Sequence, residues 1–289
     1  MVRIITDAAA DITKEIAEEL SIEILPFMIA TQDRQIIADE NLDLEEFYDI
    51  IETSAEVPTT SQMSPADIED IYRRVGKESQ ILHITMSAKA SGINNTSNMV
   101  ASQLNDEGFD IVVYDSSSFS LAFGTAVIEA ARMAKEGKSR EDIIDYITSV
   151  YTRDTAYFLV DDLTQLKKSG RIKATTMAIS KALDIKPILM VNDGLVEAFR
   201  KIRGLKKAIT VLVDFIEERM DAPEENELLI LHSRADDKVE IVEKMVRERI
   251  NPKSIKCAKV GPVITTHAGV GVLGVYFKHK KAYTEYENK

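Results

Sequence analysis

The sequence has little of what several classes of protein require. It contains a single cysteine, Cys257, and no tryptophan in 289 residues. One cysteine excludes an intrachain disulfide and a zinc site built from cysteines. No apolar run approaches the roughly 18 residues of a membrane-spanning helix, and the first apolar run is too short for a signal peptide. We therefore expect a cytoplasmic protein.

Motifs of common nucleotide-binding and hydrolytic enzymes are also missing. Without G-x-x-x-x-G-K-[ST] the chain is not a P-loop NTPase, and without G-x-S-x-G an α/β-hydrolase triad has little support. No H-x-x-x-H or H-E-x-x-H pair occurs, so we expect no metal site. Residues 269–274 match G-x-G-x-x-G, but strand-forming residues follow them and the chain ends at Lys289, which argues against a dinucleotide site. Glycines in a strand more often mark a bulge or a close approach, here to a helix or to a long apolar ligand.

The charge balance narrows the choice of partners. With 48 acidic and 36 basic residues the formal net charge is -12. This acidity argues against general binding to nucleic acid or to anionic membranes. At 45% hydrophobic and 29% charged residues the composition is that of a globular protein, and the length suggests one large domain or two modest ones.

Strands and helices alternate in the first half of the chain, which predicts a parallel sheet with helices on both faces. The pattern changes near Ala156, where a hairpin and a second α/β alternation follow. We predict an α/β protein with an N-terminal three-layer parallel-sheet domain (residues 1–155) and a C-terminal α/β sandwich domain (residues 156–289). The segment near 60–78 packs with the second domain in this interpretation. Further expectations are a helix over residues 174–183, a strand over 263–266, and His279 in a solvated tail.

The most distinctive stretch lies between two prolines, Pro58 and Pro65, and contains three consecutive hydroxyl residues, Thr59, Thr60 and Ser61. A helix is predicted to begin at the second proline, with Ser64 as its N-cap and an acidic residue at N3. A short loop in front of a helix N-terminus suits an anion, although an ordinary capped turn needs no ligand. The residues alone leave both interpretations open.

Other polar groups could join this loop. Ligands of parallel sheets bind beyond the carboxyl ends of the strands, and polar segments follow three predicted strands, at residues 7–11, 87–92 and 115–118. His267 lies among small residues that leave its ring accessible, although a lone histidine is more often structural. The basic run 200–207 is either a solvated helix start or a docking surface for an acidic partner or a phosphorylated substrate.

In order and spacing, these pieces resemble the bacterial DegV family, the fatty-acid-binding subunits of fatty acid kinase. The similarity extends over nearly the whole chain. The matching pieces are Asp7…Asp11, Pro58-Thr59-Thr60-Ser61-Gln62, Ser91-Gly92, Asp115-Ser116, and the motifs within residues 161–172, 186–194, 201–203 and 261–274.

The resemblance implies a protein that holds one long-chain fatty acid, such as palmitate, in a tunnel between sheet and helices. It implies no catalysis and no cofactor: the carboxylate is presented to a separate ATP-dependent kinase, and the acyl phosphate feeds phospholipid synthesis. The fatty-acid-binding residues it implies are Thr60, Ser61, Ser91, Gly92, His267 and Arg171. Kinase contacts fall on Arg200, Lys201 and Arg203. We expect a monomer without nucleic acid, with transient contact with a membrane surface.

Three departures from the family pattern stand near these residues: Met63, Ile93-Asn94 and Val270. They bear on chain-length preference and remove no proposed carboxylate ligand. The alternatives are a stand-alone hydrolase, a dihydroxyacetone-kinase-like enzyme for a small polar substrate, and a lipid-responsive regulator without a kinase. A long apolar tunnel favours lipid, whereas a small polar cleft favours the enzymes.

Overall fold

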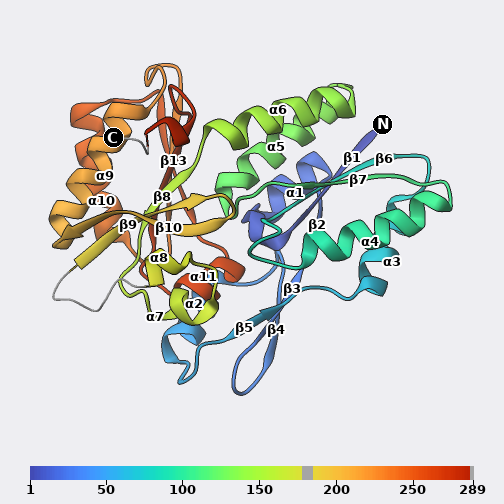
Figure 1. The fold of residues 1–289 in the computed structure, drawn as a ribbon, viewed down its shortest axis with the longest axis horizontal. Coiled ribbons are helices and arrows are strands. Elements are labelled where there is room, and N and C mark those ends of the chain that lie inside the picture. The colour runs from blue at the N-terminus through green and yellow to red at the C-terminus, as the bar shows by residue number, and fades with distance from the viewer. Residues whose placement is uncertain (178–184, 287–289) are drawn as a thin grey trace.

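The computed structural model describes residues 1–177 and 185–286 (Figure 1). Its first sheet is parallel, in the order β2-β1-β6-β7. The central strand β1 is buried on both faces, as its apolar sequence predicts. The strands are β1 (Val2–Asp7), β2 (Glu23–Leu25), β6 (Gln80–Thr85) and β7 (Asp110–Asp115). The helices around this sheet are α1 (Lys14–Leu20), α3 (Pro65–Val75), α4 (Ile93–Asp106), α5 (Leu121–Lys135) and α6 (Arg140–Arg153).

The second sheet is mixed and has the order β10-β9-β8-β13-β11-β12; β11 pairs with β12 in parallel, and the other described neighbours pair antiparallel. Its strands are β8 (Ala156–Leu159), β9 (Ile185–Asn192), β10 (Leu195–Arg203), β11 (Glu227–His232), β12 (Ser254–Lys259) and β13 (Leu273–Phe277). Helices α9 (Leu205–Arg219) and α10 (Asp236–Arg249) pack on each other and on this sheet. The α/β architecture with two such halves confirms the predicted fold class.

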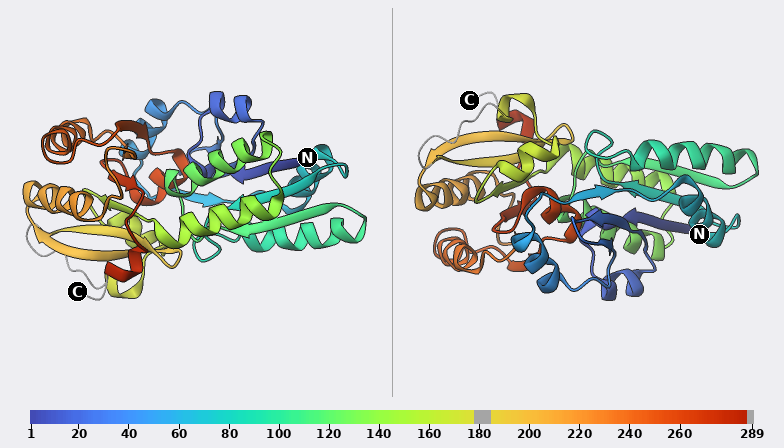
Figure 2. Two further views of the ribbon diagram at one scale, coloured as in Figure 1. Left: turned by 90° about the horizontal axis from the view of Figure 1, so that it is seen from above. Right: turned by 90° about the horizontal axis from the view of Figure 1, so that it is seen from below.

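A small antiparallel sheet from the first half of the chain reaches the second half. It has the order β4-β3-β5, with β3 (Phe27–Ala30), β4 (Gln35–Ala38) and β5 (Thr59–Ser61). Helix α2 (Leu44–Thr53) connects β4 to β5, and both α2 and β5 contact α11 (Pro262–Ala268). In both views of Figure 2 the blue N-terminal segments lie against the red C-terminal ones. One apolar core accordingly includes residues from both halves of the chain.

The hydroxyl stretch is a short strand rather than a loop. Ile29 of β3 pairs with Thr60, so the backbone of residues 59–61 finds its hydrogen bonds in a sheet. The predicted cap of the next helix is confirmed: the Ser64 side chain accepts from the Asp67 amide and the Asp67 carboxylate accepts from the Ser64 amide. A strand and a capped helix therefore hold Thr60 from both sides.

The strand predicted over residues 263–266 is wrong, because these residues lie in α11. Pro262 occupies the first position of this helix and Gly269, with φ of 83°, ends it. The β-branched residues favoured a strand, but the hydroxyl of Thr266 bonds the Pro262 carbonyl at 2.8 Å within the helix. Glycine and proline signals at the two ends outweigh the β propensity of the middle.

The expectation for His279 is also wrong. Its side chain is 1% exposed and stacks on Phe277 with the ring centroids 4.5 Å apart. The Asp154 carboxylate lies 3.5 Å from its ring nitrogen. Because alternate residues of an extended segment point to opposite sides, the flanking lysines stay in solvent while His279 turns inward.

The remaining elements are α7 (Thr164–Ser169), α8 (Ala174–Met177), and the 3₁₀ turns η1 (Ala8–Ala10) and η2 (Tyr283–Tyr286). The first residues of the helix predicted over 174–183 are confirmed by α8. The rest of that prediction lies outside the described residues.

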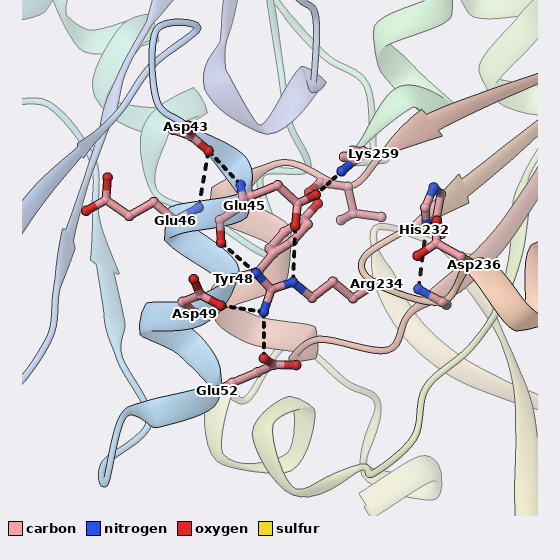
Figure 3. Close-up of polar contacts among 12 residues, drawn as sticks. Asp43, Glu45, Glu46, Tyr48, Asp49, Glu52, His232, Arg234, Asp236 and Lys259 are labelled. Carbon is pink, nitrogen blue, oxygen red and sulfur yellow. Dashed lines mark hydrogen bonds and ion pairs between the residues drawn. The ribbon is translucent and has the colours of Figure 1, made fainter.

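A cluster of charges clasps α2 to the second half of the chain (Figure 3). Arg234 follows β11 and reaches across to Asp49 and Glu52 at 2.7 Å each, and to Glu45. Beside it the Tyr48 hydroxyl donates to the Val260 carbonyl at 2.6 Å, and Tyr48 is fully buried. The clasp therefore combines solvent-accessible ion pairs with one buried hydrogen bond.

Replacing Arg234 by alanine should lower the melting temperature at low salt, and the deficit should shrink at high salt because exposed ion pairs are screened. Thermal unfolding at several NaCl concentrations measures both effects. The control is Arg132→Ala, which loses only the pair with Glu129 inside α5. Equal losses in the two variants would contradict a clasp between the halves.

Candidate functional site

The structure brings Thr60 and His267 together from positions 207 residues apart. The Thr60 hydroxyl lies 2.9 Å from Nε2 of His267. β5 presents Thr60, and His267 stands in the last turn of α11. This contact joins the small sheet of the first half to the second half of the chain.

His267 is neutral at physiological pH. Burial, with the positive charge of Arg171 as the second cause, lowers the pKa of its imidazole to about 4. A neutral ring has one N–H donor and one acceptor nitrogen. Beside Thr60 it can therefore orient a ligand by hydrogen bonding without carrying a charge of its own.

Arg171 supplies the charge of the site. Its Nε donates to the Ala90 carbonyl at 3.1 Å, and its guanidinium also donates to the Ser169 carbonyl. No carboxylate of the described chain forms an ion pair with Arg171. A half-buried guanidinium held by carbonyls and facing a neutral histidine is suited to an anionic ligand.

Ser91 and Gly92 lie at the beginning of α4, directly after the Ala90 carbonyl that Arg171 binds. The Ser91 hydroxyl accepts from the Ile93 amide at 3.3 Å, and Gly92 occupies the N-cap position. Gln62 links this turn to the hydroxyl strand, because its amide donates to Thr96 of α4 at 2.6 Å. Hydrogen bonds therefore join Thr60 to His267, the segment after Thr60 to α4, and Arg171 to the residue before Ser91.

Ser61 occupies the other face of β5. It is exposed, and alternation along the strand points its side chain away from the face on which Thr60 meets His267. Gln62, which the motif contained but the sequence reasoning gave no role, is the link instead. Its polar side chain two residues after Thr60, on the same face of the extended chain, is the sequence feature that could have identified it.

An apolar cavity of about 40 Å³ lies beneath α11, between the helix and the second sheet. Ile264 and Ala268 of α11 line it, as do Phe158 of β8 and Gly274 of β13. The remaining lining residues are Phe119, Ser120, Ala156, Val191, Leu231, Val260 and Val272, so Ser120 is the one polar residue among them. The same helix therefore carries His267 at its end and the wall of an apolar cavity along its side.

Gly274 explains part of the glycine-rich segment. A Cβ there would lie 3.5 Å from the Cβ atoms of both Phe158 and Leu231, at the cavity wall. Gly269 and Gly271 precede β13 and have φ of 83° and 88°, a backbone conformation that other residues rarely adopt. Positive φ and the close approach of Gln165 and Asp161 account for Gly269 and Gly271 without a dinucleotide motif.

The three basic residues assigned to a partner follow the site along β10. The first residues of this strand pair with the segment after Arg171, through the bridge between Ile172 and Val196. Lys201 and Arg203 are exposed, and the Arg200 guanidinium lies 4.3 Å from the centre of the Phe199 ring. They form a basic edge along the later part of β10, four to seven residues beyond Val196.

The described residues contain neither a cluster of metal-ligating side chains nor a membrane-spanning helix. No group of three or more histidine, cysteine, aspartate or glutamate side chains there could hold a metal ion. No described helix is both long enough and apolar enough to cross a membrane.

Comparison with known proteins places this site in context. The model of the DegV family, described as an uncharacterised protein family, matches residues 1–280. The chain belongs to the DegV family. A DegV domain-containing protein of Clostridium perfringens is 33% identical over 280 residues, which cover 95% of this chain and 96% of that protein. The protein DegV of Bacillus subtilis is 30% identical over 278 residues, covering 95% and 98%.

Solved structures of DegV proteins share the fold. A fatty acid binding DegV family protein from Streptococcus agalactiae superposes with a TM-score of 0.87 at 28% identity, covering 97% of this chain and 99% of that one. For DegV from Bacillus subtilis, described as a fatty acid binding protein, the TM-score is 0.84 at 29% identity, with 96% and 99% covered.

Proposed function

We propose that this protein binds one long-chain fatty acid, with its carboxylate at Thr60, Ser91, Arg171 and His267 and its chain in the cavity beneath α11. The observation that carries the proposal is an arginine that no described carboxylate pairs with, near a neutral histidine whose helix also lines an apolar cavity. The fatty acid binding described for the DegV proteins of S. agalactiae and B. subtilis supports it.

The polar groups match a carboxylate. A buried carboxylate is costly unless it is hydrogen-bonded and neutralised. Arg171 supplies charge, and the hydrogen-bonded pair of Thr60 and His267 supplies a hydroxyl and an imidazole as possible donors. Charge-assisted hydrogen bonds of this kind are roughly twice as strong as neutral ones.

The apolar part of the ligand requires the cavity to widen. About 40 Å³ is far below the roughly 300 Å³ at which small-molecule sites begin. Burying about fifteen methylenes gains on the order of 12 kcal/mol before ordering costs are subtracted. That gain is available to move α11 against the second sheet, since the cavity separates these two elements.

The same geometry disfavours a hydrolase. Thr60 and His267 resemble a nucleophile and its base, but a catalytic histidine is normally oriented by a carboxylate. Here the neighbouring charge is the cation of Arg171, and a pKa of about 4 makes His267 a weak base. The apolar lining of the cavity also fits a small polar substrate poorly. We infer a binding protein and not an enzyme.

We further propose that the bound fatty acid is presented to a separate ATP-dependent kinase, which forms an acyl phosphate for phospholipid synthesis in the cytoplasm. The basic edge of Arg200, Lys201 and Arg203 supports a contact with such a partner, because it lies on the strand whose first residues pair with the segment after Arg171, in a protein of net charge -12. The protein acts in this proposal as a monomer, with palmitate as a representative ligand and transient contact with a membrane surface.

Native mass spectrometry of protein purified from a bacterial host tests the binding function. We expect one bound acyl chain per protein, and exchange for added palmitate in a calorimetric titration. Purified protein that contains no lipid and also fails to bind added palmitate would refute the proposal.

Replacing Arg203 by glutamate should impair acyl-phosphate formation in a kinase-coupled assay by about tenfold while leaving palmitate affinity unchanged. Charge reversal at a rim position acts mainly on partner association. The matched control is Arg247→Glu on α10, a charge reversal at an exposed arginine paired with Glu243. A loss of palmitate binding in the Arg203 variant, or equal effects of both reversals, would contradict the assignment.

A further inference from the structure

Helix α11 is short, and its two ends meet different parts of the first half of the chain. His267 near its last turn contacts Thr60, and Gly261 before its first turn contacts Asp11. About 9 Å of helix separates these two ends, given a rise of 1.5 Å per residue. Any shift of the first end is therefore carried to the second.

Asp11 is held in an unusual position. It follows the turn η1 with φ of 54°, in the left-handed region that non-glycine residues seldom adopt. One carboxylate oxygen, Oδ2, accepts from the Ser120 hydroxyl at 2.5 Å. Ser120 itself has φ of 60°, and its amide donates to the Ala9 carbonyl at 2.8 Å. Two strained residues from separate elements thus fix one carboxylate.

The other oxygen faces α11. A Cβ on Gly261 would lie 2.1 Å from Oδ1 of Asp11, a separation that real Cβ atoms do not reach. The Gly261 amide is close enough to stabilise the charge on Asp11, although no donor of the described chain is aligned with Oδ1 as a full hydrogen bond. The glycine and the carboxylate therefore define how near the helix can come.

We propose that Asp11 is a positioning residue, whose carboxylate seats the first end of α11 and thereby sets the place of His267 against Thr60. This inference rests on the proposed fatty-acid function, because that function gives the place of His267 its importance. Asp11 touches no ligand in this scheme and acts only through the helix.

The charge of Asp11 lowers the stability of the fold, which argues that it is kept for its geometry. Burial raises the pKa of this carboxyl to about 7; Ser120 and Gly261 oppose the rise, and the charge of Asp7 adds to it. Because this folded-state value exceeds the ordinary 3.8, protonated Asp11 favours the folded state. This contribution to stability is complete below about pH 3.8 and is lost as the pH rises through about 7.

Other ionisable groups surround Asp11. Asp7 shares its turn, and Tyr48 of α2 lies near enough for the Asp11 charge to raise the pKa of its hydroxyl. Charged residues of α1, of α5, of the segment before α2 and of the β11–β12 edge line the cleft outside it. These are Lys14 and Glu15, Arg132, Asp39 and Glu40, and Glu227, Lys256 and Lys259, in that order.

Asparagine at position 11 separates geometry from stability. Oδ2 of Asp11 accepts from Ser120 and Oδ1 lies close to Gly261, whereas an asparagine has only one acceptor oxygen, so its NH₂ must turn toward Ser120 or Gly261. We expect Asp11→Asn to weaken palmitate affinity about tenfold and to shift the imidazole NMR signals of His267, with no lower melting temperature at pH 8. A merely structural residue would lower the melting temperature and leave the His267 signals of the folded protein in place.

Asp7→Asn is the matched control. Asp7 is buried in the same turn, and burial likewise raises its pKa to about 7, but its oxygens accept from the amides of Ala9 and Met86 and not from α11. The palmitate affinity of this variant should be within twofold of the wild-type value. Its His267 NMR signals should not differ from those of the wild type. Equal effects of the two substitutions would overturn the proposal.

A double-mutant cycle tests the contact itself. Gly261→Ala pushes a methyl group against Oδ1, and we expect it to reduce palmitate affinity at least tenfold. In an Asp11→Ala background the same change should cost much less, because the opposing oxygen is gone. Additive losses would overturn the proposal.

The two levels of inference fail in different ways. Wild-type protein that binds no fatty acid refutes the proposed function, while the His267 signals still report on the seating of α11. Wild-type protein that binds palmitate, with an Asp11→Asn variant of equal affinity and unchanged His267 signals, refutes the positioning role alone.

Discussion

Replacing Arg171 by methionine should weaken the binding of long-chain fatty acids by roughly 10- to 100-fold. Hydrogen bonds to charged groups contribute about 1.5–3 kcal/mol, and each 1.4 kcal/mol is a factor of ten in affinity. No described carboxylate competes for Arg171, so the full interaction is available to a ligand. Methionine retains much of the apolar stem and removes only the guanidinium.

The comparison of palmitate with hexadecanol makes this test specific for the carboxylate. Wild-type protein should prefer the acid, and the Arg171 variant should lose that preference while still binding the alcohol. The pKa of His267 should rise toward its ordinary value of 6.5, because the Arg171 charge now lowers it. Calorimetry measures the affinities and an NMR titration measures the pKa.

Arg200→Met is the matched control, because it makes the same change on β10, where the guanidinium lies over Phe199. It should bind palmitate like the wild type. If Arg171→Met also kept full affinity and full preference for the acid, the carboxylate site would have to be placed elsewhere.

Replacing Gly274 by leucine should abolish palmitate binding. The glycine lies in β13 at the wall of the cavity, and a larger side chain would project between Phe158 and Leu231. A ligand whose methylenes contribute about 0.8 kcal/mol each loses most of its affinity when its path is filled. A native mass spectrum of the purified variant should show no bound acyl chain.

The stability of this variant distinguishes filling from misfolding. A leucine side chain is larger than a cavity of about 40 Å³, so overpacking should lower the free energy of unfolding by about 1–3 kcal/mol while the variant still folds. Gly274→Ala is the control, since its Cβ would meet both neighbours at an ordinary 3.5 Å. The alanine variant should still bind, and a leucine variant that took up palmitate normally would contradict the path beneath α11.

Local sequence features predicted much of what surrounds the site. The alternation of apolar strands and helices indicated the parallel sheet, and the capping pair of Ser64 and Asp67 marked the start of α3. Such features depend on neighbours within a few residues, so the sequence contains them directly. The same local reasoning was wrong for residues 263–266. The prediction gave more weight to their β-branched side chains than to the proline and glycine that mark the ends of the helix.

The candidate site residues were named from motifs, but their relations were not. Thr60 and His267 are separated by 207 residues, and nothing local states that they meet at 2.9 Å. The contact of Asp11 with Gly261 was likewise invisible, although both residues belong to matching motifs. Contacts at such separations are set by how two sheets pack, and packing sums many weak interactions along the whole chain.

The sequence by itself determined that this is an α/β protein of acidic charge with hydroxyl groups, a histidine and an arginine in motifs of one family. Tertiary structure alone decided that Arg171 lies where no described carboxylate neutralises it, that burial keeps His267 neutral, and that the helix carrying His267 also lines an apolar cavity. The physical reason is that charge state and ligand preference depend on burial and on distances through space. Burial and distances are properties of the folded chain, whereas residue types and helix caps can be read from the amino-acid sequence.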